Sequence, residues 1–345
     1  MSRFRRRLWF ALLSVSLVCP TLAVEAATSR AQAKPATSSG GTAVKKPTTK
    51  STAAARRARL ARQRQAQRAR EAREAAIPRF KRDEAGDLIP DVRAAAAIIY
   101  NPVTHEVLYD ANSQDARSIA SITKVMTAVV FLEHEFDLDR EVVVDPVDAR
   151  GASITYLRPR ERVTVDTLLH LLLIASDNLA ARTLARASIF GPEGFIERMN
   201  QKAVELGFEH TRYADPSGLH GDNVSSAYDM ARLIAFAAND ERIAPIMRKA
   251  DYEVRTNLRN ITVRNTNKLL GSDVEVRGGK TGFIRRAGYC LATLLQTPQG
   301  GQVAVVILGA RSSASRFMEA RHLMNWLVSK AHDLMAGDIG TEQPE

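Results

Sequence analysis

Two side chains in this 345-residue chain have the types and spacing that covalent acyl-transfer chemistry requires. Ser121 and Lys124 stand three positions apart, at the start of an apolar run, 125–130, that predicts a helix. Residues at i and i+3 share one helix face, so the Lys124 amine can reach the Ser121 hydroxyl. A serine hydroxyl is a weak nucleophile without a base, and a neutral lysine amine can be that base. The pair therefore predicts a serine nucleophile that is activated by a lysine.

Lys124 can act as the base only if its pKa lies far below the usual lysine value. A shift from about 10.4 toward about 7 costs roughly 4–5 kcal/mol. Burial and a second nearby cation both move a lysine pKa in this direction. We expect Lys124 to be buried, and we expect Lys280 to be the second cation.

A second motif, Ser176-Asp177-Asn178, follows along the chain. A hydroxyl can both accept and donate a proton, so we expect Ser176 to pass the proton from the base to the leaving nitrogen. The amide of Asn178 can orient Lys124 and hold the substrate backbone through hydrogen bonds. Each motif alone is a weak signal, and its weight comes from the order and spacing of all of them.

The third motif is Lys280-Thr281-Gly282. Lys280 and Thr281 can bind a substrate carboxylate or carbonyl. We expect Gly282 to leave room for an extended peptide that lies along the strand. The backbone N–H groups of Ser121 and Phe283 are the expected donors to the oxyanion that forms during acyl transfer.

The three motifs together resemble the S-x-x-K, S-D-N and K-T-G set of penicillin-binding proteins and class A β-lactamases. Over about residues 88–335 the chain is similar to the low-molecular-mass penicillin-binding proteins, the D-alanyl-D-alanine carboxypeptidase and endopeptidase family. Further stretches that carry the resemblance are Arg117–Lys124, Asp215–Leu219, Asn265–Leu270 and Gly279–Gly282. The resemblance implies an α/β (α+β) fold: a five-stranded antiparallel sheet flanked by helices, an all-α lobe, and a cleft between them. It also implies a peptidoglycan peptide as substrate, β-lactams as covalent inhibitors, and no cofactor.

Within this family, carboxypeptidases usually carry an extra β-rich domain after the catalytic one. Some ten residues follow the last expected helix here, which resembles the penicillin-binding protein 7 type, an endopeptidase of D-alanyl–diaminopimelate cross-links. A carboxypeptidase that trims pentapeptides is the alternative. The family often has His or Tyr in place of Phe283, so this position leaves the exact peptide substrate open.

Three other functions fit the sequence less well. A class A β-lactamase needs a deacylating glutamate within E-x-x-L-N, and the matching region, 207–211, lacks that motif. A zinc peptidase needs clustered ligands, whereas the seven histidines are scattered. A non-enzymatic wall-binding protein would not need all three motifs. We therefore predict a serine-type D,D-peptidase, a hydrolase without a metal.

The first 26 residues have the features of a cleaved secretory signal peptide. Four arginines within 3–7 precede an apolar run, 8–18, and small residues stand before a cut after Ala26. The apolar run is shorter than the roughly 20 residues that cross a bilayer. We therefore predict export to the periplasm. After the cut one cysteine remains, Cys290, in an apolar run that indicates a buried structural thiol.

Residues 27–87 differ from the rest of the chain in composition. Between 28 and 82 there are 16 Lys and Arg against two acidic residues, whereas 83–345 carry a net charge of −6. We expect 28–52 to be disordered because large apolar side chains are few, and 53–76 has high helix propensity. The segment is expected to be a tether, or to adhere to anionic wall polymer or membrane. Nucleic acid would suit the charge equally well, but the expected export argues against it.

The body, 88–335, mixes strand and helix patterns. Strands at both ends with helices between them predict a sheet built from distant segments, together with a helical lobe. Expected strands lie at 94–100, 107–109, 252–256, 260–266, 276–283, 287–296 and 302–310. Expected helices lie at 121–135, 165–174, 178–188, 193–206, 226–239 and 313–334, and 336–345 is expected to be disordered.

Overall fold

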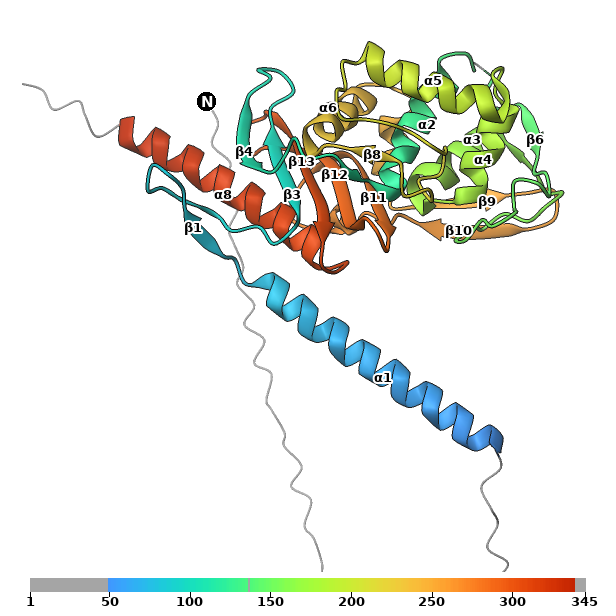
Figure 1. The fold of residues 1–345 in the computed structure, drawn as a ribbon, viewed down its shortest axis with the longest axis horizontal. Coiled ribbons are helices and arrows are strands. Elements are labelled where there is room, and N and C mark those ends of the chain that lie inside the picture. Colours follow the sequence, from blue (N-terminus) through green and yellow to red (C-terminus); the bar gives the residue numbers. More distant parts are fainter. Residues whose placement is uncertain (1–48, 136, 339–345) are drawn as a thin grey trace, which may run out of the picture. The chain divides into compact units, whose positions relative to one another are not determined.

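The computed structural model describes residues 49–135 and 137–338 (Figure 1). The chain divides into two units, residues 1–56 and 57–345. The predicted signal peptide, 1–26, lies outside the described residues. So does most of the segment 28–52 that we expected to be disordered, although its last four residues belong to a helix.

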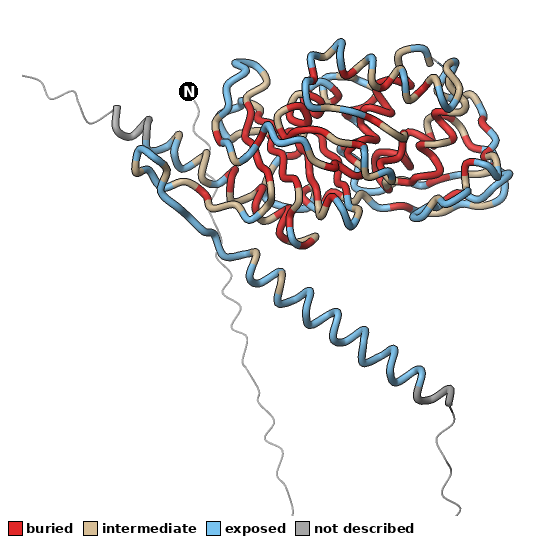
Figure 2. Tube along the Cα trace, in the orientation of Figure 1, coloured by how far each residue is buried: buried red, intermediate tan, exposed pale blue. Residues whose placement is uncertain are grey.

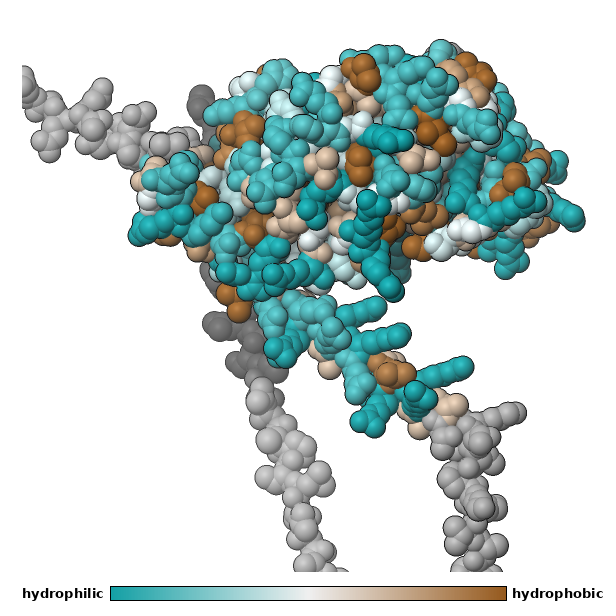
Figure 3. Space-filling view, in the orientation of Figure 1, coloured by the Kyte–Doolittle hydropathy of each residue, from teal (hydrophilic) through white to brown (hydrophobic). Residues whose placement is uncertain are grey.

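Helix α1 (Thr49–Ala76) covers the stretch with high helix propensity. Ala, Arg and Gln dominate its sequence, and Gly and Pro are absent from it, so few residues oppose helix formation. Its described side chains are nearly all exposed, and Figure 3 shows them as mainly hydrophilic. Leu60 is the one large apolar side chain among them, and it is 45% exposed. The helix therefore has no apolar stripe that could pack on a core.

Five antiparallel strands form the central sheet, in the order β11-β12-β13-β3-β4 (Figure 1). The first two strands of this sheet in sequence order, β3 and β4, pair with each other, and β3 also pairs with β13 from the far end of the chain. This arrangement confirms the predicted five-stranded sheet built from distant segments. The strands are β3 (Ala96–Tyr100), β4 (Val107–Ala111), β11 (Val276–Ile284), β12 (Gly288–Gln296) and β13 (Gln302–Ala310).

The two faces of this sheet belong to two separate hydrophobic clusters, because alternate strand residues point to opposite faces. Ile98 packs in the cluster that contains α6 (Ala227–Ala238), and Ile99 packs in the cluster that contains α8 (Ser315–Asp338). Figure 2 shows most of these strands as buried over most of their length, whereas the edge strand β4 is largely exposed or half-buried. The central strands therefore have apolar residues on both faces and read as continuous apolar runs.

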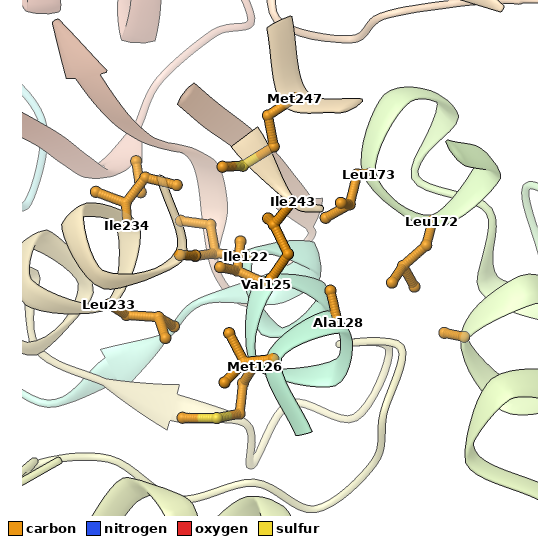
Figure 4. Packing of buried hydrophobic residues seen from close by; sticks show 14 of the residues in the cluster. Ile122, Val125, Met126, Ala128, Leu172, Leu173, Leu233, Ile234, Ile243 and Met247 are labelled. Atoms are coloured by element: carbon orange, nitrogen blue, oxygen red, sulfur yellow. The ribbon is translucent and has the colours of Figure 1, made fainter. Parts of the chain in front are cut away.

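The all-α lobe is organised around α2 (Thr123–Leu132), whose ten residues are all buried. Figure 4 shows Val125, Met126 and Ala128 of this helix among apolar side chains of neighbouring segments. A helix that is buried on every side is a core helix, so the first turn of α2, which carries Lys124, lies in the packed interior. The other elements of the lobe are α3 (Val165–His170), a π-helical turn (Leu171–Ala175), α4 (Asn178–Ala187) and α5 (Gly191–Glu205).

Within residues 49–135 and 137–338, four two-stranded ribbons lie outside the central sheet. We predicted strands at 252–256 and 260–266. The sequence did not show that these two strands pair with each other and not with the central sheet. The short α7 (Ala244–Arg248) and the turn at Lys268–Gly271 were not predicted. The ribbons are β1 (Phe80–Arg82) with β2 (Leu88–Pro90), β5 (Arg117–Ser118) with β8 (Val224–Ser225), β6 (Glu141–Val143) with β7 (Arg162–Thr164), and β9 (Asp251–Arg255) with β10 (Asn260–Arg264).

Two segment boundaries differ from those expected. The β1–β2 ribbon crosses the expected start of the body at residue 88, so ordered structure begins earlier than composition suggested. Helix α8 continues to Asp338, three residues into the segment 336–345 that we expected to be disordered. Among the helices between Thr49 and Asp338, none combines the length and apolar character needed to cross a membrane.

Candidate active site

Ser121 lies in a tight 3-10 turn, Ala120–Ile122, that leads directly into α2. Ala120 adopts a left-handed conformation with φ of 49°, which is uncommon for a residue other than glycine. The Thr123 hydroxyl donates to the Ala120 carbonyl at 2.7 Å and supports this turn. Strained backbone of this kind is often found at functional sites, where the surrounding structure maintains it.

The Lys124 side chain is completely buried, and its amine lies beside the Ser121 hydroxyl. The Nζ atom donates to Ser121 Oγ at 3.0 Å and to Asn178 Oδ1 at 2.7 Å. It also donates to the backbone carbonyl of Ser217. The structure thus brings together three residues that the sequence placed in the site, one each from the first turn of α2, its preceding 3-10 turn and the start of α4.

Burial is the main reason why the pKa of Lys124 falls to about 7. The negative charges of Asp215 and Asp177 oppose this shift, and the positive charge of Arg182 adds to it. A lysine with this pKa has a substantial neutral fraction at neutral pH. Its amine can therefore take the proton of the hydroxyl that lies 3.0 Å away.

Lys280, the expected second cation, lies in the interior of the protein. It is buried, and its amine donates to the Thr281 carbonyl at 2.9 Å. Burial, followed by the charges of Lys124 and Arg316, lowers the pKa of Lys280 well below its usual value. The two lysines are therefore coupled, since the charge of Lys124 lowers the pKa of Lys280, and Arg182 is a further cation that lowers the pKa of Lys124.

The second motif sits at the junction of the π-helical turn and α4. Ser176 ends the turn in a left-handed conformation, with φ of 59° and ψ of 35°. Asp177 caps α4, because its carboxylate accepts the N–H groups of Leu179 and Ala180 at 2.7 and 2.9 Å. Within the described residues, the Ser176 hydroxyl has no hydrogen-bond partner, so it is available to a bound substrate. The Asn178 amide donates to the Ser153 carbonyl.

The third motif lies on β11, at the edge of the sheet. A Cβ atom at Gly282 would lie 2.7 Å from the Ile119 carbonyl oxygen and 3.0 Å from the Ser121 nitrogen. Glycine at this position therefore lets β11 approach the Ser121 turn, which is a different reason from the room for a peptide that we expected. Phe283, the next residue, is 48% exposed, and its ring stacks on Tyr289 at 4.2 Å.

The loop Asp215–Leu219 carries part of the family resemblance, but no role in the site was predicted for it. The Ser217 carbonyl accepts hydrogen bonds from Lys124 Nζ and, at 3.5 Å, from Ser121 Oγ. Gly218 has φ of 81°, and a Cβ atom there would lie 2.1 Å from the Ala120 carbonyl oxygen. The Asp-Pro-Ser-Gly turn pattern was the available signal, but a local pattern cannot show which distant residue the loop contacts.

A buried lysine of lowered pKa, in hydrogen-bond contact with a serine on a strained turn, can activate that serine as a nucleophile. The chain belongs to the D-alanyl-D-alanine carboxypeptidase family, which matches residues 83–312. The family comprises serine D,D-peptidases, and this membership confirms the resemblance seen in the sequence.

Individual relatives agree with this membership. The chain is 32% identical over 243 residues to a D-alanyl-D-alanine endopeptidase of Pseudomonas aeruginosa, covering 69% of this chain and 78% of the relative. It is 31% identical to the D-alanyl-D-alanine carboxypeptidase DacF of Bacillus subtilis, covering 69% of this chain and 62% of the relative. The Streptomyces K15 DD-transpeptidase has a similar structure, with a TM-score of 0.65, 29% identity, and coverage of 69% and 97% of the two chains.

Proposed function

We propose that the protein is an endopeptidase that hydrolyses the D-alanyl bond of peptidoglycan cross-links through an acyl-enzyme on Ser121. The observation that carries the proposal is the 3.0 Å contact between Lys124 Nζ and Ser121 Oγ, together with a Lys124 pKa of about 7. The endopeptidase activity is favoured because relatives in Pseudomonas aeruginosa and Escherichia coli, each 32% identical, are D-alanyl-D-alanine endopeptidases.

In the first half of the reaction, Lys124 takes the Ser121 proton while Ser121 Oγ attacks the D-alanyl carbonyl carbon. The N–H groups of Ser121 and Phe283 hold the resulting oxyanion, which the close approach of β11 to the Ser121 turn supports. The C–N bond then breaks, and the Ser176 hydroxyl passes the proton from Lys124 to the leaving nitrogen. The amine product departs, and an ester of Ser121 remains.

In the second half, water attacks this ester and the free carboxylate product leaves, with the proton returned to Ser121 Oγ. Asn178 orients Lys124 in both halves, since its Oδ1 accepts from Nζ at 2.7 Å. Lys280 and Thr281 bind the substrate carboxylate or carbonyl. A bound carboxylate would favour the protonated form of Lys280, because an opposite charge raises the pKa of a lysine. A β-lactam follows the same first half and stays attached to Ser121.

Purified muropeptides distinguish the proposed endopeptidase from the alternative carboxypeptidase. The mature protein should convert cross-linked dimers into monomers, and a Ser121→Ala variant should leave the dimers intact. Release of free D-alanine from pentapeptide monomers, with the dimers unchanged, would instead identify a carboxypeptidase. Chromatography with mass spectrometry measures both products in the same sample.

We propose that residues 1–26 direct export to the periplasm, and that residues 28–82 adhere to anionic wall polymer or membrane. The support for adhesion is the exposure of α1 to solvent. Its arginines lie on a helix that has no apolar face to pack against a protein core. The two acidic residues of α1 offset few of these charges: Glu74 pairs with Arg70, and Glu71 accepts a hydrogen bond from Gln67. The charge of this helix is therefore available to an external anionic surface.

A further inference from the structure

Thr266 contacts the surroundings of two motifs at once. Its backbone N–H donates to the Ile174 carbonyl at 3.0 Å, in the π-helical turn that ends at Ser176. Its side-chain oxygen accepts a hydrogen bond from Thr281 Oγ1 at 2.7 Å. A single residue thus connects the turn before Ser176 with the strand that carries Thr281.

The residues beside Thr266 hold its backbone in place. The Asn265 amide donates to the Met247 carbonyl at 3.2 Å and to the Lys249 carbonyl at 2.9 Å. Its Oδ1 atom accepts the N–H group of Asn267 at 2.9 Å. Both ends of the Asn265 amide are therefore engaged around Thr266. The Thr266 oxygen is held at a defined position beside Thr281, which is the condition for orienting another side chain.

The number of protons limits what the two hydroxyls can do. A threonine hydroxyl has one proton and two acceptor lone pairs. In the structure Thr281 donates its proton to Thr266, so it can only accept hydrogen bonds from other groups. A carboxylate also only accepts, and it cannot bind Thr281 in this arrangement. Rotation of both hydroxyls removes the conflict, because Thr266 then donates to Thr281 and Thr281 donates to the carboxylate.

We propose that Thr266 is a positioning residue, which donates to Thr281 when Thr281 binds the substrate carboxylate next to the scissile bond. A hydroxyl that accepts a hydrogen bond becomes a better donor, so the chain from Thr266 to the carboxylate is cooperative. Thr266 itself does not touch the substrate. The inference rests on the proposed function, since its ligand is the carboxylate beside the leaving nitrogen of a D-alanyl substrate.

Two thioester substrates isolate this effect from general damage to the site. Both contain the same N-acyl-D-alanyl group, and the leaving group is either thioglycolate, which has a carboxylate, or thioglycolamide, which has none. We expect Thr266→Val to lower kcat/KM for the thioglycolate ester about fivefold to tenfold, mainly through KM, as for the loss of one hydrogen bond. The thioglycolamide ester should change less than about twofold, because it has no carboxylate to bind.

Two further variants complete the comparison. Thr266→Ser keeps the hydroxyl and should restore the preference for the carboxylate. Thr262→Val makes the same change at an exposed threonine of β10 and should have no effect on either ester. If Thr266→Val does not fold, Thr266→Ala also removes the hydroxyl, and turnover of the thioglycolamide ester reports the amount of active protein.

Other outcomes overturn specific parts of this inference. Equal losses on both esters would show a structural role for Thr266, and an unchanged or improved thioglycolate rate would show that Thr281 does not need its proton. Either result overturns the positioning role while the proposed function stands. A wild-type protein that cleaves neither ester would overturn the proposed function, and the role of Thr266 with it.

Discussion

Helices α2 and α1 both carry cations, but their surroundings give these cations opposite properties. Every residue of α2 is buried, and burial lowers the pKa of Lys124 to about 7. The described side chains of α1 are nearly all exposed to water, where arginine keeps its charge. A cation in the packed helix can become a base, whereas a cation on the solvated helix can only attract negative charge. The apolar residues of α2 let it pack in the core, whereas α1 has no apolar stripe, and the resulting packing decides this difference.

Replacing Lys124 with a cation that cannot lose its proton should have the largest effect. Lys124→Arg keeps the positive charge but removes the base, and general-base catalysis contributes roughly 10²–10⁴ in rate. We expect acylation by benzylpenicillin to slow by about this factor, measured from the rate of adduct formation. Near-normal acylation by the variant would mean that another group takes the Ser121 proton.

A matched exchange on α1 provides the control for this prediction. Arg68→Lys changes the type of cation at an exposed position and leaves the charge in place. We expect no change in acylation rate, because charge type is immaterial where the side chain is solvated. Equal losses of acylation rate in Lys124→Arg and Arg68→Lys would contradict the different roles of the cations on α2 and α1.

The dependence of acylation on pH should show the lowered pKa of Lys124 directly. The amine is an active base only when neutral, so the rate should rise with pH until it reaches a plateau above about 7. Below this value we expect the rate to fall about tenfold for each pH unit, as the amine becomes protonated. A protein that lacks residues 28–76 should give the same profile. A flat profile between about pH 5.5 and 8.5 would contradict the role of neutral Lys124.

Removal of residues 28–76 should have the smallest effect on catalysis and a selective effect on adhesion. This deletion keeps the β1–β2 ribbon, which begins at Phe80. Turnover of a small soluble peptide should stay unchanged. Co-sedimentation with wall sacculi or anionic vesicles should weaken at about 50 mM salt, since each Lys or Arg near such a surface contributes at most about 1 kcal/mol. Equal sedimentation of both proteins would show that the segment is only a tether.

The parts of the site that could be predicted from the sequence depend on short-range geometry. The contact between Ser121 and Lys124 follows from their spacing on one helix face. The Ser217 carbonyl could not be predicted, because it lies 93 positions from Lys124 and any residue type has a carbonyl. The lowered pKa of buried Lys280 was also not predicted, since the depth of burial of a charge depends on the whole fold.

A similar limit applies to the fold. The apolar runs of β12 and β13 predicted strands, and the structure shows that both are buried over most of their length. The strand patterns of β9 and β10 also predicted strands, but these two strands pair only with each other. A period of two shows that a segment is a strand, and it does not show which strand is the partner. The π-helical turn before Ser176 was likewise expected as ordinary helix, because its sequence is uniformly apolar.

Mass spectrometry after incubation with benzylpenicillin tests most directly whether Ser121 forms the acyl-enzyme. The wild-type protein should gain the mass of one penicilloyl group, and peptide mapping should place it on the fragment that contains Ser121. The Ser121→Ala variant should keep its thermal midpoint and gain no mass. A full-strength adduct on that variant would contradict the assignment of Ser121 as the nucleophile.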